Sequence, residues 1–174
     1  MRQSVASLIA AVIGELFIQL TAGSLPPPLV WPVRIVGALA FVGVLWYAVL
    51  SPWGRGEFRP RRRRSALRIY YVCLGLLILA VPAGIWLFQQ VLPVPALIVP
   101  WLVVLVGLHF LPFASAFGIP LFERMGAALL AIGVVGGAVV LQFSRSASVL
   151  TGVVAGFVLL LFSAAAAPAG KSDE

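Results

Sequence analysis

The sequence VLTGVVAGFVLLLFSAAAA, residues 149–167, decides the fold class. Its nineteen residues include no charged side chain, and a helix of that length rises through about 30 Å, the thickness of the hydrocarbon core of a bilayer. Similar apolar runs recur along the chain. We therefore predict an all-α, polytopic membrane helix bundle of about six transmembrane helices, with spans at residues 4–23, 31–50, 67–88, 96–117, 124–143 and 149–167.

The amino-acid composition also indicates a chain that is surrounded by lipid. Of the 174 residues, 62% are hydrophobic and 10% are charged, whereas a soluble domain is about 45–50% apolar and about 25% charged. Strands of a membrane barrel would alternate polar and apolar residues, and these runs do not. We expect residues 1–167 to form a single transmembrane domain, and residues 168–174 to be a disordered tail.

The first span has a second interpretation, a cleaved signal peptide with Arg2 as its basic region. Glu15 argues against it, because it interrupts the apolar region that such a peptide needs. The run is also longer than the usual ~7–15 residues. Cleavage would leave five spans and the same later topology.

Arginine is concentrated in one loop. Seven of the twelve Lys and Arg residues fall between Arg55 and Arg68, and such residues remain preferentially on the cytoplasmic side. We therefore expect residues 51–66 to be a cytoplasmic loop, which with six spans also places both termini in the cytoplasm. The arginine-rich composition further indicates a bacterium, and hence its cytoplasmic membrane.

The same loop suggests a partner. A polybasic segment beside a membrane attracts anionic lipid headgroups by about 1 kcal/mol per residue. Docking to an acidic protein is the alternative. Nucleic acid is not an expected partner, because no aromatic platform or folded binding module accompanies the arginines. The arginines expected at the headgroups are Arg59, Arg61, Arg62, Arg63 and Arg64.

Glu15 lies about twelve residues into the first span, where a charged side chain costs several kcal/mol and is rarely kept without a partner. Residues four apart stack on one helix face. Glu15 therefore shares a face with Ser7, Ala11, Gln19 and Gly23, which suits contact with protein or water. One hypothesis makes Glu15 a proton or cation site; the other makes it an interhelical hydrogen-bonding group.

His109 is the only histidine and lies in the fourth span, three residues before Pro112. Histidine titrates near neutral pH and suits proton relay, although a lone membrane histidine is also often a buried polar contact. By rise per residue, Glu15 and His109 fall at a similar depth. A Glu15–His109 pair is therefore geometrically allowed.

Two halves of three spans would be inverted relative to each other in the membrane. Residues 34–43, RIVGALAFVG, resemble residues 124–133, RMGAALLAIG, and GELF at 14–17 resembles GLHF at 107–110. Chance recurrence of Gly, Ala, Leu and Val is the competing explanation. If the repeat is real, a substrate site is expected near the midplane between the halves.

Small residues four apart allow helices to approach closely. Gly133 and Gly137 form such a pair in the fifth span, and Gly152 and Gly156 form another in the sixth. They are expected to serve packing. The sequence leaves open whether they pack within the chain or join copies into a homo-oligomer.

Chemistry that needs clustered ligands is not expected. Only Glu15 of the five acids is deep in a span, so a two-carboxylate site cannot be built in the membrane. One histidine and one cysteine, Cys73, provide no metal cluster or disulfide, and no phosphate-binding or nucleophile motif is present. We expect no enzyme, no catalytic residue, no metal and no cofactor.

Residues 107–113, Gly-Leu-His-Phe-Leu-Pro-Phe, resemble a Gly-x-His-Phe-x-Pro stretch in small multipass bacterial membrane proteins of uncharacterised function. The resemblance covers the fourth span and the start of the fifth. It implies a multipass fold, and it implies no substrate and no catalytic role.

Two functional hypotheses remain. The first is passage or transport of a proton, ion or small solute through a polar centre between the first and fourth spans, lined by Glu15, Gln19 and His109. The second is a non-transporting membrane scaffold or accessory subunit. In that case the same residues hold helices together, and the arginine loop binds lipid or a partner.

Overall fold

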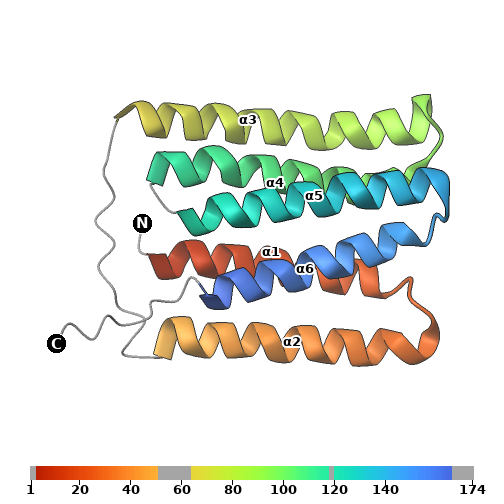
Figure 1. The fold of residues 1–174 in the computed structure, drawn as a ribbon, viewed down its shortest axis with the longest axis horizontal. Helices are drawn as coiled ribbons and strands as arrows, with labels where there is room; N and C mark the ends of the chain where they lie inside the picture. Colours follow the sequence, from red (N-terminus) through yellow and green to blue (C-terminus); the bar gives the residue numbers. More distant parts are fainter. Residues whose placement is uncertain (1–2, 51–63, 118–119, 166–174) are drawn as a thin grey trace. The chain divides into compact units, whose positions relative to one another are not determined.

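The computed structural model describes residues 3–50, 64–117 and 120–165. Of these, 92% are helical and none forms a strand. A π-helical turn, η2 (Leu87–Val91), extends the third helix, and a 3₁₀ turn, η3 (Pro95–Leu97), leads into the fourth. The long helices in Figure 1 are α1 (Gln3–Ala22), α2 (Pro27–Leu50), α3 (Arg64–Trp86), α4 (Ile98–Phe117), α5 (Pro120–Gln142) and α6 (Ala147–Ala165).

Five of these helices are long and apolar enough to cross a membrane, and α1 adds a shorter apolar stretch, Ser7–Ala22. Large apolar side chains cover their outer surfaces; Trp46 on α2 is 67% exposed and Leu79 on α3 is 68% exposed. Apolar surface of this extent is stable only in contact with lipid. The predicted all-α, polytopic membrane bundle is confirmed, and the chain is a multipass membrane protein.

Two of the long helices begin at a proline. The α2 and α5 helices start at Pro27 and Pro120, each four residues before the predicted span. Proline is tolerated in a first helical turn, because the amide hydrogen it lacks would have no partner there. Most of the predicted arginine loop, residues 51–66, and the predicted tail, residues 168–174, lie outside the described residues.

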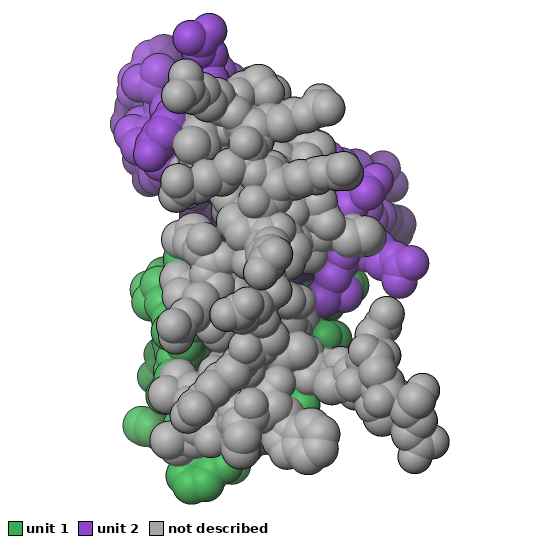
Figure 2. Space-filling view, turned by 90° about the vertical axis from the view of Figure 1, so that its left-hand side faces the viewer, with its two compact units in different colours: residues 1–60, 156–174 green, residues 61–155 purple. Residues whose placement is uncertain are grey.

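The helices group into two compact units, coloured separately in Figure 2. Unit 1 contains residues 1–60 and 156–174, and therefore α1, α2 and the end of α6. Unit 2 contains residues 61–155, and therefore α3, α4, α5 and the start of α6. Each unit thus combines the first two helices of one predicted half with all or part of the third helix of the other half.

This distribution of helices between the units is compatible with an inverted repeat. However, Gly43 and Gly133, which end the two similar stretches, have different surroundings. A Cβ added at Gly133 would lie 2.6 Å from Cγ2 of Val104, whereas one added at Gly43 would meet nothing within 4 Å. The repeat therefore remains a prediction.

Unit 1 is held together by a close crossing of α1 and α6. A Cβ added at Gly14 would lie 2.8 Å from the carbonyl oxygen of Gly156, so larger residues cannot replace either glycine without moving backbone. Ser7 Oγ donates a 2.6 Å hydrogen bond to the carbonyl oxygen of Ser163 along the same contact. A small buried core lies beside the crossing and comprises Ala11, Ile18, Val44 and Leu160.

Unit 2 depends on a similar crossing of α4 and α5. A Cβ added at Gly107 would lie 2.8 Å from the carbonyl oxygen of Gly126, and the reverse distance is also 2.8 Å. Gly133 lies seven residues further along α5, against Val104 and Pro100 of α4. Small residues on one face therefore let these two backbones approach, which is how helices associate when lipid removes the hydrophobic driving force.

The contact between α3 and α4 uses an aromatic side chain. Trp101 of α4 donates from Nε1 to the carbonyl oxygen of Ala80 at 3.2 Å, and its indole packs onto Gly84 of α3. The indole N–H of Trp101 therefore has a hydrogen-bond acceptor inside the helix contact. Gly84 is required because the indole occupies the space of a side chain.

The predicted small-residue pairs contribute to packing within the chain. Gly133 faces α4, and Gly156 faces Gly14 and Ile18 of α1. Gly137 has looser neighbours on η3 and α4, with Leu97 and Pro100 at 3.8 and 3.7 Å from an added Cβ. A homo-oligomer through these glycines remains a prediction.

The glycine crossing in unit 2 predicts the effect of a single methyl group. Gly107→Ala should destabilise the protein by about 1–3 kcal/mol, because the added Cβ meets backbone atoms that cannot move aside. Gly75→Ala on α3 is the matched control, since a Cβ there meets nothing within 4 Å. Unfolding in detergent micelles by titrated dodecyl sulfate measures both, and equal stabilities of the two variants would contradict the crossing.

Candidate functional site

Glu15 lies in the helical hairpin formed by α1 and α2. The turn at residues 23–26 joins the two helices, with Glu15 eight residues before Gly23 and Arg34 eight residues after Pro26. Antiparallel helices with a short turn place such positions at the same level. At 1.5 Å per residue, both residues lie about 12 Å from the turn along the helix axes.

Gln19 connects the two helices through both hydrogens of its amide group. Its Nε2 donates to Oε1 of Glu15 at 2.5 Å and, at 3.4 Å, to the backbone carbonyl oxygen of Arg34. An amide group carries two donor hydrogens, so both have acceptors here. The sequence prediction that Glu15 and Gln19 share a protein-facing position is therefore correct, although the neighbouring helix is α2.

Arg34 extends the cluster to the end of α1. Its Nη2 donates to the carbonyl oxygen of Gln19 at 3.1 Å and lies 3.1 Å from the position of a Cβ added at Gly23. Gln19 belongs to the last turn of α1, where carbonyl groups lack intrahelical partners and the helix dipole favours a cation. Arg34 thus caps α1 inside an apolar segment.

Two buried polar atoms of this cluster have no hydrogen-bond partner: Oε2 of Glu15 and Nε of Arg34. The carboxylate packs against α2, because a Cβ added at Gly37 would lie 3.0 Å from Oε2 of Glu15. A buried acceptor without a donor is costly in lipid. Oε2 of Glu15 is thus a buried acceptor that α2 covers without giving it a donor.

His109 belongs to unit 2. It is half-buried on α4, and its ring meets that of Phe110 edge to face with centroids 6.2 Å apart. Phe110 in turn stacks on Phe122 of α5 at 5.9 Å. Because Glu15 and Gln19 belong to unit 1, the pairing of Glu15 with His109 remains a prediction.

A cavity of about 290 Å³ lies elsewhere in unit 1, between α2 and α6. Glu15, Gln19 and Arg34 do not line it. Among the residues that the structure describes, no three His, Cys, Asp or Glu side chains group closely enough to hold a metal ion. The predicted headgroup-binding arginines fall outside the part of the chain whose side chains are described; they are Arg59, Arg61, Arg62, Arg63 and Arg64.

Sequence reasoning missed the role of Arg34. In the sequence Arg34 lies only near the start of the second span, whereas in the structure its side chain reaches back to α1. The signal was available, because a short turn between two spans places residues equidistant from it side by side. Glu15 and Arg34 satisfy that condition, so their shared level in the hairpin could have been found from spacing.

The cluster predicts a stability pattern across single and double variants. Gln19→Leu should cost about 1–3 kcal/mol, because it leaves Oε1 of Glu15 buried without a donor. Adding Glu15→Leu to that variant should restore much of the loss, since both polar partners are then replaced by apolar groups. Gln142→Leu, at an exposed position on α5, is the control and should change stability by less than about 0.5 kcal/mol.

These stabilities can be measured by unfolding in detergent micelles. A double variant that is less stable than Gln19→Leu by the full cost of a second lost contact would show that the two side chains act independently, against the hydrogen bond described here.

Comparison with known proteins gives no family. No protein-family model matches the chain, and no curated protein or solved structure matches it either. The resemblance at residues 107–113 therefore remains an expectation, and the argument for function depends on the geometry of this chain.

Proposed function

We propose that this chain is a non-catalytic, non-transporting scaffold or accessory subunit of a bacterial cytoplasmic membrane, with both termini in the cytoplasm. Its helices anchor it in the membrane, and the arginine-rich sequence between α2 and α3 gathers anionic lipid headgroups. One observation carries the proposal. The polar side chains that a pathway would need, Glu15 and Gln19, are hydrogen-bonded to each other and packed against α2.

The position of the cavity supports the same conclusion. A pathway for a proton or ion needs polar groups around a water-accessible space. The cavity between α2 and α6 is lined by apolar residues and one tyrosine, and the Glu15 cluster does not contribute to it. The polar cluster instead meets the needs of the α1–α2 hairpin, because it satisfies a helix end and joins two helices.

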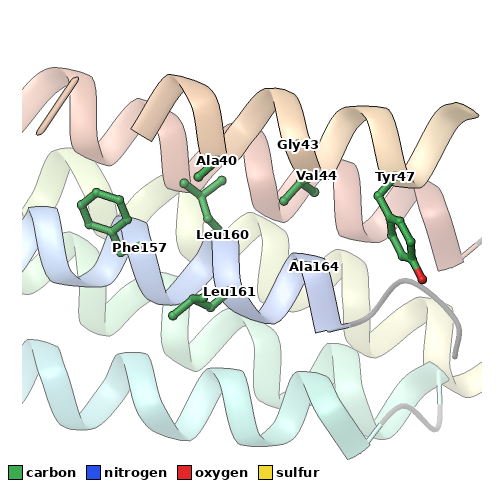
Figure 3. A pocket seen from close by; sticks show the side chains of 8 residues that line it. All are labelled: Ala40, Gly43, Val44, Tyr47, Phe157, Leu160, Leu161 and Ala164. Atoms are coloured by element: carbon green, nitrogen blue, oxygen red, sulfur yellow. The ribbon is translucent and has the colours of Figure 1, made fainter. Parts of the chain in front are cut away.

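The direction of the helices supports the proposed topology. Figure 3 shows α2 and α6 running in the same direction past each other, from Ala40 and Phe157 towards Tyr47 and Ala164. The ends of these helices therefore lie at one face of unit 1. Along the sequence, arginines follow Leu50 and Lys171 follows Ala165, and positive residues favour the cytoplasmic side.

Passage of a proton is the second candidate, and a specific observation favours it. Oε2 of Glu15 and Nε of Arg34 are buried without hydrogen-bond partners, so the cluster leaves one hydrogen-bond acceptor and one hydrogen-bond donor unused. Under this candidate, replacing Glu15 or Gln19 in unit 1, or His109 in unit 2, should reduce flux, and ions or small solutes are the alternative cargo.

Liposome flux separates the two candidates. The scaffold proposal expects wild-type vesicles loaded with pH-sensitive and potential-sensitive dyes to leak no faster than empty vesicles, across a panel of ions and solutes. Wild-type flux above that level that is lost in Glu15→Gln or in His109→Ala would overturn the scaffold proposal in favour of passage. The variants need only retain wild-type unfolding curves to be interpretable.

Lipid selectivity tests the recruiting role. Spin-labelled phosphatidylglycerol should be immobilised by the wild-type protein more than phosphatidylcholine, by up to about fivefold for each arginine near the surface at low salt, and less at high salt. Replacing Arg61, Arg62, Arg63 and Arg64 by Gln should remove most of the difference. Arg145→Gln, at an exposed position between α5 and α6, is the control. Equal immobilisation of both lipids by the wild-type protein would contradict this role.

A further inference from the structure

The cavity between α2 and α6 is an elongated groove in unit 1. Four residues of α2 form one wall and four residues of α6 form the other, as Figure 3 shows. From Ala40 to Tyr47 the α2 wall covers seven residues, or about 10 Å at 1.5 Å per residue. The lining residues are Ala40, Gly43, Val44, Tyr47, Phe157, Leu160, Leu161 and Ala164.

The lining excludes water as the stable occupant. Its side chains carry one polar atom, the hydroxyl of Tyr47, and a cavity needs two to four polar partners to hold a water molecule. Apolar cavities of about 150 Å³ stay dry and take up apolar molecules instead. The volume here, about 290 Å³, exceeds that size.

Part of the groove exists because one position has no side chain. A Cβ added at Gly43 would meet nothing within 4 Å. At Gly14, on the other side of the α1–α6 contact, an added Cβ meets backbone within 3.0 Å. Gly43 therefore is not needed for the approach of helices in this unit, and its missing side chain leaves space on the surface of α2.

The two ends of the groove differ. Ala40 and Phe157 lie at the inner end, and Tyr47 lies at the end towards which α2 and α6 terminate. Tyrosine favours the membrane interface, because its ring is apolar and its hydroxyl is polar. The groove therefore runs from the apolar interior towards the interface, in the direction of an acyl chain in one leaflet.

We propose that this groove is a binding site for one acyl chain of a bilayer phospholipid, with the hydroxyl of Tyr47 at the ester end of the lipid. Dispersion contacts with both helix walls hold the chain, because the protein already lies in hydrocarbon and the hydrophobic effect contributes little. An empty groove would forfeit those contacts. All residues of the site are described by the structure.

The charges of the chain's own C-terminal tail make a lipid the better occupant of the groove. The sequence after Ala167 is Pro-Ala-Gly-Lys-Ser-Asp-Glu, which carries three charges and no large apolar side chain. Such a segment would place charged groups against Leu160 and Val44, at a high desolvation cost. The neighbouring surface of α2 is also apolar and exposed, with Trp46 at 67% and Leu39 at 66% exposure.

The inference extends the proposed lipid-recruiting role, and the two can fail separately. Phospholipids with a photoactivatable diazirine in the acyl chain are reconstituted with the full-length protein, one with a phosphatidylglycerol headgroup and one with phosphatidylcholine. After illumination, labelled peptides are identified by mass spectrometry. Labelling of the groove residues should exceed labelling of the lipid-facing surface of α3, for example at Leu79.

Filling the groove should remove the excess label. Gly43→Leu should lower groove labelling about tenfold, which corresponds to 1.4 kcal/mol of binding free energy. Ala164→Leu, from the opposite wall, should act in the same way and guards against a folding defect in one variant. Gly75→Leu on α3 is the matched control, because a Cβ there also meets nothing within 4 Å, and it should leave groove labelling unchanged.

Three outcomes decide the question. Groove labelling no higher than that of α3 with either lipid, or unchanged by both filling variants, would overturn the acyl-chain site. A change from dimer to monomer in Gly43→Leu, without excess lipid labelling in the wild type, would assign the groove to a second copy and also overturn it. Equal groove labelling by the two lipids supports the site while contradicting headgroup selection.

Discussion

The hydrocarbon of a bilayer offers no hydrogen-bond partner to an unsatisfied polar group, and this constraint governs the structure. Because hydrocarbon offers no hydrogen bonds, each spanning segment must satisfy its own backbone, which only a helix can do locally. The remaining problem lies at helix ends and at polar side chains. The α1–α2 hairpin shows one solution, in which Arg34 reaches the carbonyl oxygen of Gln19 in the last turn of α1, and the amide of Gln19 serves both Glu15 and the backbone of α2.

The same constraint changes what packing must achieve. Burial from water cannot drive these helices together, so contact area and close approach decide which ones meet. Glycine provides that approach at Gly14 and Gly156 in unit 1 and at Gly107 and Gly126 in unit 2. Where glycine has no neighbour, as at Gly43, the result is a groove open to lipid. Close packing and the groove are therefore two consequences of where small residues lie.

A polar residue deep in a membrane helix is often taken as a mark of transport. In this chain Glu15 has a local explanation, because its hydrogen bond to Gln19 and its contact with Gly37 belong to a helix junction. The unpaired oxygen of Glu15 is what keeps passage as a second candidate. A deep acid therefore marks transport only where it faces a water-accessible space, and the cavity of unit 1 does not include Glu15.

The sequence by itself determined the class of fold, the number of helices and the shared position of Glu15 and Gln19. Apolar runs of membrane length report the solvent directly, and residues four apart share a helix face in any helix. Only the tertiary structure decided which glycines touch, that Arg34 caps α1, and that α2 and α6 leave a groove. These features depend on which faces of separate helices meet, and a single apolar sequence does not encode that choice locally, because lipid accepts every apolar face equally well.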